Sequence, residues 1–258
     1  MNAMQRIAVA GATGRVGRHV ANVLENDGHE VVAIARSTGV DLTTGEGLEE
    51  ALEGATTVVD VATWPTPDQQ AATEFFETAA RNLQEYGERA GVRGIVVVSI
   101  IGVDRFSAGY GAAKLAHEHA SLSGPIPVRI LRAAQFHEFV PELVDWGRNG
   151  EAIYVPKMRT QLVAARTVAE ALAGLATGTD WAEPAPTTIP EIAGPREERL
   201  ADVARLLVAR RGDPYGIEEV TDDNLLGTEL LENGGLLPGP DATLAGPTFE
   251  EWLKEEFS

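Results

Sequence analysis

Short runs of apolar, mostly β-branched residues alternate with longer amphipathic segments through the first half of the chain. This alternation predicts an α/β fold, in which crossover helices connect the strands of a parallel sheet. Strands are expected at Ile7–Ala10, Val31–Ala35, Thr57–Val61, Ile95–Val98 and Val128–Leu131. Runs without polar residues, such as Ile95–Val98, are typical of strands covered on both faces. We therefore expect a doubly wound sheet.

Helices are expected between these strands and after them. The segment 15–27 places Val16, Val20 and Leu24 four residues apart, on one helix face. Further helices are expected at 46–53, 69–90, 109–121, 137–148, 165–176 and 197–211, a strand at Thr188–Ala193, and a last helix at Phe249–Phe257 capped by Thr248. Because the regular alternation loosens after residue 132, we predict a small C-terminal α+β subdomain there, packed on the first part as one compact unit.

The composition excludes several classes of function. The 258 residues carry a net charge of −18, which disfavours binding to nucleic acid or to anionic membranes. The chain has no cysteine, and its five histidines do not have metal-ligand spacing, so we expect no metal site. No apolar run approaches the length of a membrane span and the N-terminus has no signal-peptide core, so we expect a cytoplasmic protein.

A glycine-rich loop follows the first expected strand and opens the first expected helix. Glycines at 11, 14 and 17 frame the run Gly11-Ala12-Thr13-Gly14-Arg15-Val16-Gly17. This spacing suits a dinucleotide pyrophosphate: one glycine permits the tight turn, one permits close approach of the phosphates, and one permits close packing of helix and strand. The alternative is a turn without a ligand. The order of strand, loop and helix favours a Rossmann fold with residues 1–132 as its dinucleotide-binding core.

The residue expected at the adenosine ribose is an arginine. Arg36 lies 19 residues beyond Gly17, where an acidic residue would accept the ribose 2′-hydroxyl of NAD. A guanidinium instead pairs with a 2′-phosphate, and Arg15 adds a second positive charge, so we predict NADP, with NAD as the alternative if both arginines are merely solvated. We expect two further pairs beside the cofactor: Asp41 and Leu42 near the adenine, and Ala62 and Thr63 after the third strand.

Tyr110 and Lys114 lie four residues apart, on one face of an expected helix. The pair suits carbonyl reduction, because the ammonium favours the phenolate and the tyrosine exchanges a proton with the substrate oxygen. Ser99, at the end of the fourth strand, could polarise the same oxygen or cap the strand. We expect His117 and Glu118 to be solvated helix positions.

The motifs resemble the short-chain dehydrogenase/reductase superfamily, most closely its atypical branch of NmrA-like NAD(P)-binding proteins and related quinone or ketone reductases. The resemblance rests on Gly11–Gly17, Val59–Thr63, Val98–Gly102, Tyr110–Lys114 and Ile130–Phe136. It implies a nucleotide-binding core with substrate held beneath the C-terminal part, and a homodimer formed through the helices at 69–90 and 109–121. Two features depart from the family: the separation of Ser99 from the tyrosine, and the lack of proline after the fifth strand.

These observations lead to one hypothesis with two alternatives. We predict an NADP(H)-dependent oxidoreductase that reduces a small apolar ketone or quinone, with residues 133–258 binding the substrate. Trp64, Phe136 and His137 are the candidate substrate contacts, although a packed loop and a structural histidine are the plain alternatives. The first functional alternative is a non-catalytic NADP(H) sensor. The second is a nucleotide-sugar epimerase or dehydratase, ranked last because the substrate domain of such enzymes is usually larger.

Overall fold

The computed structural model describes residues 3–221 and 228–257 of the chain. The chain forms two compact units. The first consists of Met1–Ser99, Ser107–Leu131 and Val168–Ile189, and the second of Ile100–Phe106, Arg132–Thr167 and Pro190–Ser258. The predicted division at residue 132 stays a prediction, since the first unit has segments on both sides of it. The substrate-binding role of the later residues stays a prediction.

A parallel sheet is the frame of the fold. It contains β1 (Arg6–Ala10), β2 (Glu30–Ile34), β3 (Thr57–Asp60), β4 (Gly94–Ile100), β5 (Val128–Ala133), β9 (Glu191–Ala193) and β12 (Thr243–Leu244). Among the described residues its strand order is β12-β9-β5-β4-β3-β1-β2. Every residue of β3 is buried, as expected for a strand covered on both faces. The predicted doubly wound α/β fold is therefore confirmed.

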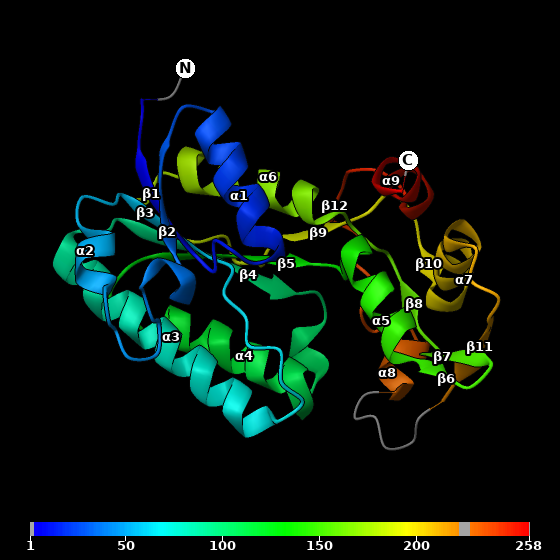
Figure 1. Cartoon of the computed structure of the whole chain (residues 1–258). Coiled ribbons are helices and arrows are strands. Elements are labelled where there is room, and N and C mark those ends of the chain that lie inside the picture. Colours follow the sequence, from blue (N-terminus) through cyan, green and yellow to red (C-terminus); the bar gives the residue numbers. More distant parts are fainter. Residues whose placement is uncertain (1–2, 222–227, 258) are drawn as a thin grey trace. The chain divides into compact units, whose positions relative to one another are not determined.

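Helices cover both faces of the sheet in the first unit. They are α1 (Arg15–Asn26), α2 (Leu48–Leu52), α3 (Gln69–Ala90), α4 (Gly109–Leu122) and α6 (Ala165–Gly178). Figure 1 shows α1 and α6 on one side of the strands, and α3 and α4 running side by side on the other. The side chain of Asp68 caps α3 by accepting hydrogen bonds from two backbone amides, and Gly91 ends this helix in the left-handed conformation.

The strand order places a crevice at the site of the glycine loop. From β1 the chain proceeds to β2 on one side, whereas β3 lies on the other side of β1. In open α/β sheets, ligands bind where the order reverses in this way, outside the carboxyl ends of the strands. The loop after β1 and the segment after β3 meet at this point, and short 3-10 turns follow β2 (Arg36–Thr38) and β4 (Val103–Arg105).

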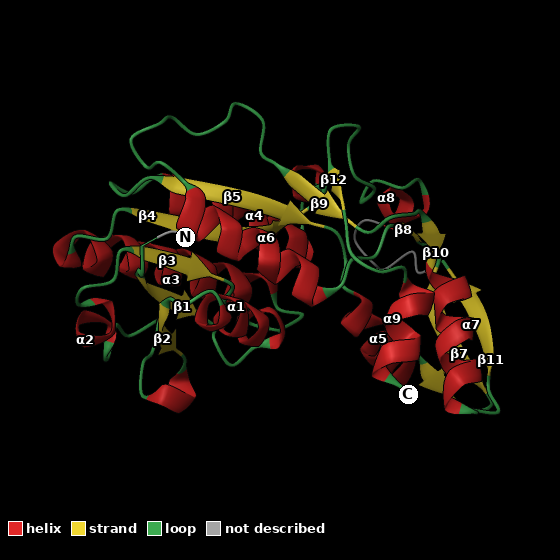
Figure 2. Ribbon diagram, turned by 90° about the horizontal axis from the view of Figure 1, so that it is seen from above, coloured by secondary structure: helices red, strands yellow, loops and turns green. Residues whose placement is uncertain are grey.

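The second unit has a core of its own. It contains α5 (Val140–Trp146), α7 (Leu200–Arg211), α8 (Thr228–Glu232), α9 (Phe249–Glu256) and the strands β6 (Arg148–Asn149), β7 (Ala152–Pro156), β8 (Arg159–Thr160), β10 (Glu198–Arg199) and β11 (Gly216–Val220). Figure 2 shows α5 and α7 beside β7 and β11. The predicted Thr248 cap of the last helix is confirmed, because the threonine side chain accepts from the Glu251 amide.

One predicted helix of this unit is divided. The segment 137–148 forms a 3-10 turn (His137–Phe139) followed by the shorter helix α5. Pro141 accounts for the break, because proline lacks an N–H and is tolerated only in the first turn of a helix. The short strands were not predicted, because two-residue pairs such as β8 and β10 are too short to form an alternating pattern.

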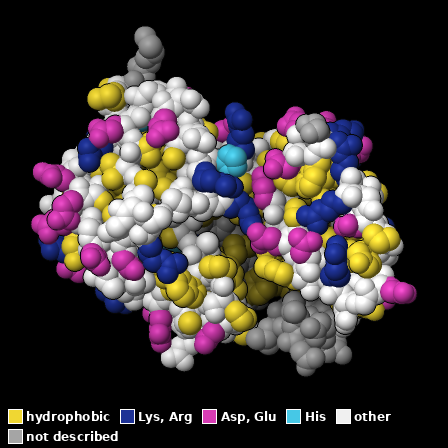
Figure 3. All heavy atoms as spheres, viewed as in Figure 1, with side chains coloured by type: hydrophobic (Ala, Val, Ile, Leu, Met, Phe, Trp, Pro, Cys, Tyr) yellow, Lys and Arg dark blue, Asp and Glu magenta, His cyan; other side chains and the backbone are white. Residues whose placement is uncertain are grey.

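Charged side chains of both signs lie on the surface. Figure 3 shows acidic and basic side chains spread over the face that it draws. Within the described ranges, no helix combines the length and the apolar character needed to cross a membrane.

Candidate functional site

The three loop glycines have separate steric roles. Gly11 has a φ of +81°, and a Cβ there would lie 2.8 Å from the Cα of Ala62. A Cβ on Gly17 would lie 2.1 Å from the carbonyl oxygen of Gly11, so the first turn of α1 packs on the loop only with glycine. At Gly14 a Cβ would meet only that same oxygen, at 3.1 Å. Gly14 therefore leaves the N-terminus of α1 open to a ligand.

This open side belongs to a cavity of about 520 Å³ in the first unit. Its lining includes eight of the residues predicted to bind cofactor: Gly11, Thr13, Gly14, Arg36, Asp41, Leu42, Ala62 and Thr63. The three others, Arg15, Val16 and Gly17, lie in the first turn of α1 and are not among its lining residues. Trp64, predicted to contact substrate, lines this same pocket. The pocket is thus lined by residues that follow β1, β2 and β3.

One wall of the pocket was not predicted. It is a face of α3 formed by Ala71, Glu74, Phe75 and Thr78, whose successive separations of three, one and three residues are those of a helix face. The spacing was visible in the sequence, but small and polar residues on an amphipathic helix do not by themselves indicate a ligand. Ile34, Ala35, Val40, Thr43 and Val61 complete the lining.

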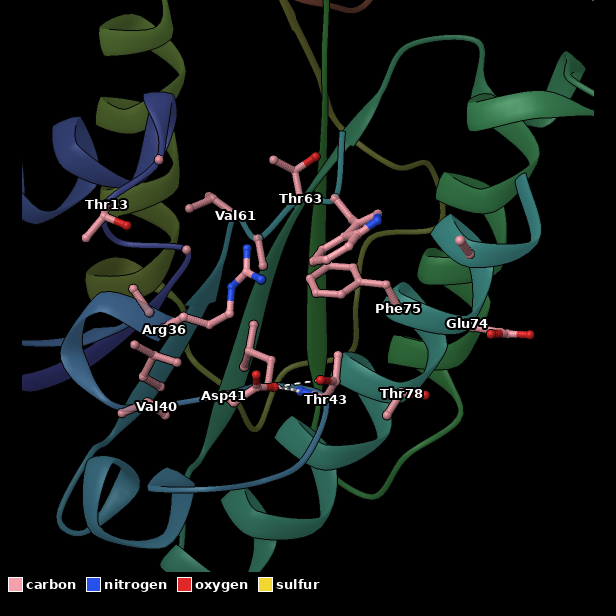
Figure 4. Close-up of a pocket in the computed structure, with 18 residues that line it drawn as sticks. Thr13, Arg36, Val40, Asp41, Thr43, Val61, Thr63, Glu74, Phe75 and Thr78 are labelled. Atoms are coloured by element: carbon pink, nitrogen blue, oxygen red, sulfur yellow. Dashed lines mark hydrogen bonds between the residues drawn. The ribbon is translucent and has the colours of Figure 1, made fainter. Parts of the chain in front are cut away.

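An arginine and two aromatic rings face one another across the pocket. The guanidinium of Arg36 lies 5.1 Å from the centroid of the Trp64 ring, a cation–π distance. The Trp64 and Phe75 rings lie 5.5 Å apart with an interplanar angle of 30°. Figure 4 shows Arg36 extending into the pocket, while the carboxylate of Glu74 points away from it. The pocket therefore presents a positive charge to a ligand.

Asp41 organises the loop after β2. Its Oδ1 accepts hydrogen bonds from the Thr43 amide at 2.7 Å, from the Thr43 hydroxyl at 2.6 Å and from the Thr44 amide at 3.2 Å. The Thr43 hydroxyl contributes most to lowering the pKa of Asp41, and Arg36 adds to this effect. Asp41 is thus an ionised acid that shapes the pocket wall beside Arg36.

The phenol of Tyr110 is one hydrogen bond from the pocket. Its oxygen lies 2.6 Å from Oγ1 of Thr63, which is a lining residue. Burial raises the pKa of Tyr110, and the bond with Thr63 offsets part of this increase. At neutral pH the tyrosine is therefore a protonated phenol.

Lys114 does not point to solvent. Its side chain is 4% exposed, and Nζ donates to the Val98 carbonyl at 2.9 Å and lies 2.9 Å from Nδ1 of His117. Nζ also lies 4.7 Å from the centroid of the Phe76 ring. Burial lowers the pKa of Lys114 to about 8. The predicted stabilisation of a phenolate by this ammonium is not seen, because burial dominates the pKa of Tyr110 and raises it.

The expectation that His117 and Glu118 are solvated was wrong. His117 and Glu118 are 1% and 2% exposed, not solvated. The reason is that α4 packs along α3, so the face carrying His117 meets buried Asp60 at the end of β3. His117 Nε2 lies 2.9 Å from Oδ2 of Asp60. Sequence reasoning missed Asp60, although an acidic residue ending an apolar strand was a visible sign.

The remaining predicted site residues lie elsewhere. Ser99 is 3% exposed, and among the described residues its buried hydroxyl has no hydrogen-bond partner. Phe136 is half-buried in the second unit, where it forms a β-bridge with Val163. His137 is fully buried between the Phe249 and Trp252 rings of that unit. Such burial leaves no surface of this ring open to a substrate, so the expected contact is not seen.

The comparisons with known proteins agree with this geometry. Residues 11–123 match a family model described as NAD(P)H-binding. A short-chain dehydrogenase/reductase superfamily protein from Agrobacterium tumefaciens with bound NAD has a TM-score of 0.69 at 18% identity, covering 98% of this chain and 96% of that one. No curated protein sequence matches the chain.

Two further structures extend the likeness. The dTDP-4-dehydrorhamnose reductase from Bacillus anthracis in complex with NADP has a TM-score of 0.71 at 15% identity, covering 99% of both chains. The UDP-N-acetylglucosamine 4-epimerase from Bacillus cereus has a TM-score of 0.68 at 20% identity, covering 97% of this chain and 94% of that one. Residues 11–123 thus match an NAD(P)H-binding family model, and the chain has a Rossmann fold like that of short-chain dehydrogenase/reductase structures, as its motifs predicted.

Proposed function

We propose that this protein is an NADP(H)-dependent oxidoreductase that reduces a small apolar ketone or quinone, with Tyr110 as the proton donor. The observation that carries the proposal is the 2.6 Å hydrogen bond between the Tyr110 phenol and the Thr63 hydroxyl. Because Thr63 lines the dinucleotide pocket, this bond joins an acid to the cavity in which the cofactor would lie.

The pocket residues fit a nicotinamide dinucleotide. The open backbone at Gly14 and the N-terminus of α1 suit the pyrophosphate, which a Cβ at this cradle would crowd. Arg36 is held by the Trp64 ring on the side of the pocket where the adenosine ribose is expected, which supports preference for a 2′-phosphate. When bound, the dinucleotide supplies the hydride.

The protein's own side chains supply the proton for the reduction. Tyr110 gives its phenolic proton to the carbonyl oxygen of the substrate as that oxygen gains charge. A raised pKa keeps the phenol protonated, which favours reduction over oxidation at neutral pH. The Thr63 hydroxyl, in contact with the phenol, can return a proton to it from the pocket side.

Aromatic side chains around the phenol support an apolar substrate. The Phe76 ring lies edge-on to Tyr110, with ring centroids 5.8 Å apart, and the Phe75 ring is 5.4 Å from Phe76. Trp64 and Phe75 line the pocket, and the buried Phe76 ring packs between Phe75 and the phenol. Apolar surface of this kind binds a ketone or quinone more favourably than a highly hydroxylated compound.

One observation supports each of the two alternatives, the NADP(H) sensor and the nucleotide-sugar epimerase or dehydratase. The Lys114 ammonium is engaged by Val98 and His117, which favours an NADP(H) sensor over an enzyme in which this lysine holds the ribose. The matched nucleotide-sugar enzymes are covered over 94% and 99% of their own lengths, so size does not argue against this second class.

The test is a Tyr110→Phe variant assayed for NADPH oxidation over a panel of ketones, quinones and nucleotide-linked sugars. We expect at least about a 100-fold loss of kcat on whichever ketone or quinone the wild type reduces, with unchanged NADPH affinity. Tyr215→Phe, which alters a phenol in the second unit, serves as the matched control and should retain full activity.

Any other outcome of this assay contradicts the proposal or favours one of the two alternative functions. Undiminished turnover by Tyr110→Phe would overturn the role of the tyrosine. Binding of NADPH without substrate-dependent oxidation over the whole panel would favour the sensor. Turnover confined to nucleotide-linked sugars would favour the epimerase or dehydratase class.

A further inference from the structure

Three ionisable side chains form a buried cluster behind the pocket. Asp60, at the end of β3, and His117, on α4, are each 1% exposed, and Lys114 lies one helical turn before His117. His117 Nε2 is 2.9 Å from Asp60 Oδ2, and His117 Nδ1 is 2.9 Å from Lys114 Nζ. The imidazole therefore bridges an acid and a base, with one nitrogen facing each.

These contacts define where the protons are. Asp60 Oδ1 accepts from the Ala62 amide at 3.0 Å, so the carboxylate acts as an acceptor through both oxygens. Its partner Nε2 of His117 must then carry the hydrogen. An ammonium only donates, so Nδ1 facing Lys114 must be the acceptor. With Asp60 ionised and Lys114 charged, one arrangement satisfies every contact: neutral His117 protonated at Nε2.

A second proton on His117 would bring two positive charges together while Lys114 is charged. A doubly protonated imidazole would direct an N–H at the Lys114 ammonium. Burial and the lysine charge lower the pKa of His117, whereas Asp60 and Glu118 raise it, with a net decrease. Burial raises the pKa of Asp60, but His117, the Ala62 amide and Lys114 together bring it below its ordinary value. Glu118, also on α4, is the remaining charged group that acts on His117 and Lys114.

The cluster also closes a ring of contacts around the phenol. From Asp60 the chain leads directly to Ala62 and Thr63 in the pocket wall, and Thr63 Oγ1 bonds the Tyr110 phenol. Tyr110 lies in the first turn of α4, and the same helix carries Lys114 and His117, of which His117 contacts Asp60. The phenol is thus placed by the pocket wall on one side and by its own helix on the other.

We infer that Asp60 and His117 are positioning residues, which hold Lys114 as the ammonium donor to the Val98 carbonyl and tie helix α4 to the pocket wall that carries Thr63. Their effect on the reaction rests on the proposed function. The proton arrangement does not, because it follows from the contacts of the protein alone.

The direct test is NMR on the full-length wild-type protein, with ¹³C-labelled lysine and ¹⁵N-labelled histidine. The chain has three lysines, of which Lys157 and Lys254 are exposed. We expect Lys114 to titrate near pH 8, as its lowered pKa of about 8 requires. His117 should show the Nε2–H tautomer and titrate below the ordinary histidine value, because its pKa is lowered by burial. A protonated Nδ1, or titration near about 6.5, would overturn the inference.

Variants test the positioning role. In Asp60→Asn the pKa of Lys114 should fall further, because a negative charge that raises it is gone. His117→Gln keeps one donor and one acceptor and should retain kcat. His117→Leu keeps neither and should lose at least about tenfold in kcat, because the phenol is misplaced. Full kcat in His117→Leu would show that the pair does not position Tyr110.

The outcomes separate this inference from the proposed function. If wild-type protein neither binds NADPH nor turns over substrate, the proposed function fails while the lysine and histidine titrations still decide the proton arrangement. If Tyr110-dependent turnover is found but His117 titrates near about 6.5, only the inference fails. Should His117→Leu not fold, wild-type NMR and His117→Gln together decide.

Discussion

The regions around His117 and His137 both bury an imidazole, but they use it differently. His117 has an ionisable partner on each nitrogen, Asp60 and Lys114. His137 lies among aromatic rings in the second unit, with Nε2 on the Pro247 carbonyl at 3.1 Å and, among the described residues, no partner for Nδ1. Burial lowers the pKa of His137 to about 4. The groups that face the nitrogens, and not burial itself, distinguish a bridging histidine from a packing one.

The largest effect should follow from removing the acid in the His117 region. Asp60→Ala leaves the His117 Nε2–H and the Ala62 amide without their buried acceptor, and it leaves the buried Lys114 charge without this negative charge near it. Truncating one partner of a buried charged pair typically costs about 3–5 kcal/mol, so we expect a fall of that size in the free energy of unfolding at pH 7. Urea denaturation followed by circular dichroism measures it.

A control for this prediction is Asp41→Ala, which removes an acid from the pocket rim instead of the buried cluster. Its bonds with Thr43 and Thr44 are in an exposed loop, so the loss should be below about 1 kcal/mol. Equal losses of unfolding free energy in the two variants would show that Asp60 contributes no more to stability than the acid of an exposed loop.

The next effect should appear in acid, in the His137 region. The folded pKa of His137 is about 4, whereas an unfolded histidine titrates near about 6.5. Because the unfolded state binds the proton first, stability is lost as pH falls from about 6.5 toward 4, by about 2 kcal/mol at pH 5. The urea midpoint of wild type relative to His137→Phe, measured from pH 8 to pH 5, reports this. A difference that does not vary with pH would refute it.

The smallest effect should be the cost of the same substitution at pH 8. His137→Phe keeps the aromatic packing against Phe249 and Trp252 and loses one hydrogen bond to the Pro247 carbonyl. We expect about 1 kcal/mol lower stability, from the lost bond. A loss of several kcal/mol would place His137 in a polar network like that of His117.

Much of the first unit was predictable because its patterns are local. Helix α3 has the predicted limits, and β1, β3, β4 and α1 differ from expectation by a few residues at their ends. The glycine loop was identifiable because backbone sterics at Gly11 and Gly17 require that residue type. In the second unit, short strands and the turn at Pro141 carry too few residues for periodicity to act on.

The candidate site was predictable where it follows strand ends and not where helices meet. Arg36 and Thr63 come shortly after strands β2 and β3, so the topology places them at one edge of the sheet. The environment of His117 depends instead on the packing of α4 against α3, which no single segment encodes. The sequence analysis therefore took His117 as solvated. It also took His137, in the second unit, as a substrate contact.

The central claim is that the pocket of the first unit binds NADP(H) through the glycine loop and Arg36. Calorimetric titration of the full chain with NADPH and with NADH tests it most directly, with Arg36→Ser as the matched variant. We expect NADPH to bind at least about tenfold more tightly than NADH, about 1.4 kcal/mol, and we expect this preference to vanish in the variant. Equal binding of the two would contradict the role of Arg36, and binding of neither would contradict the claim itself.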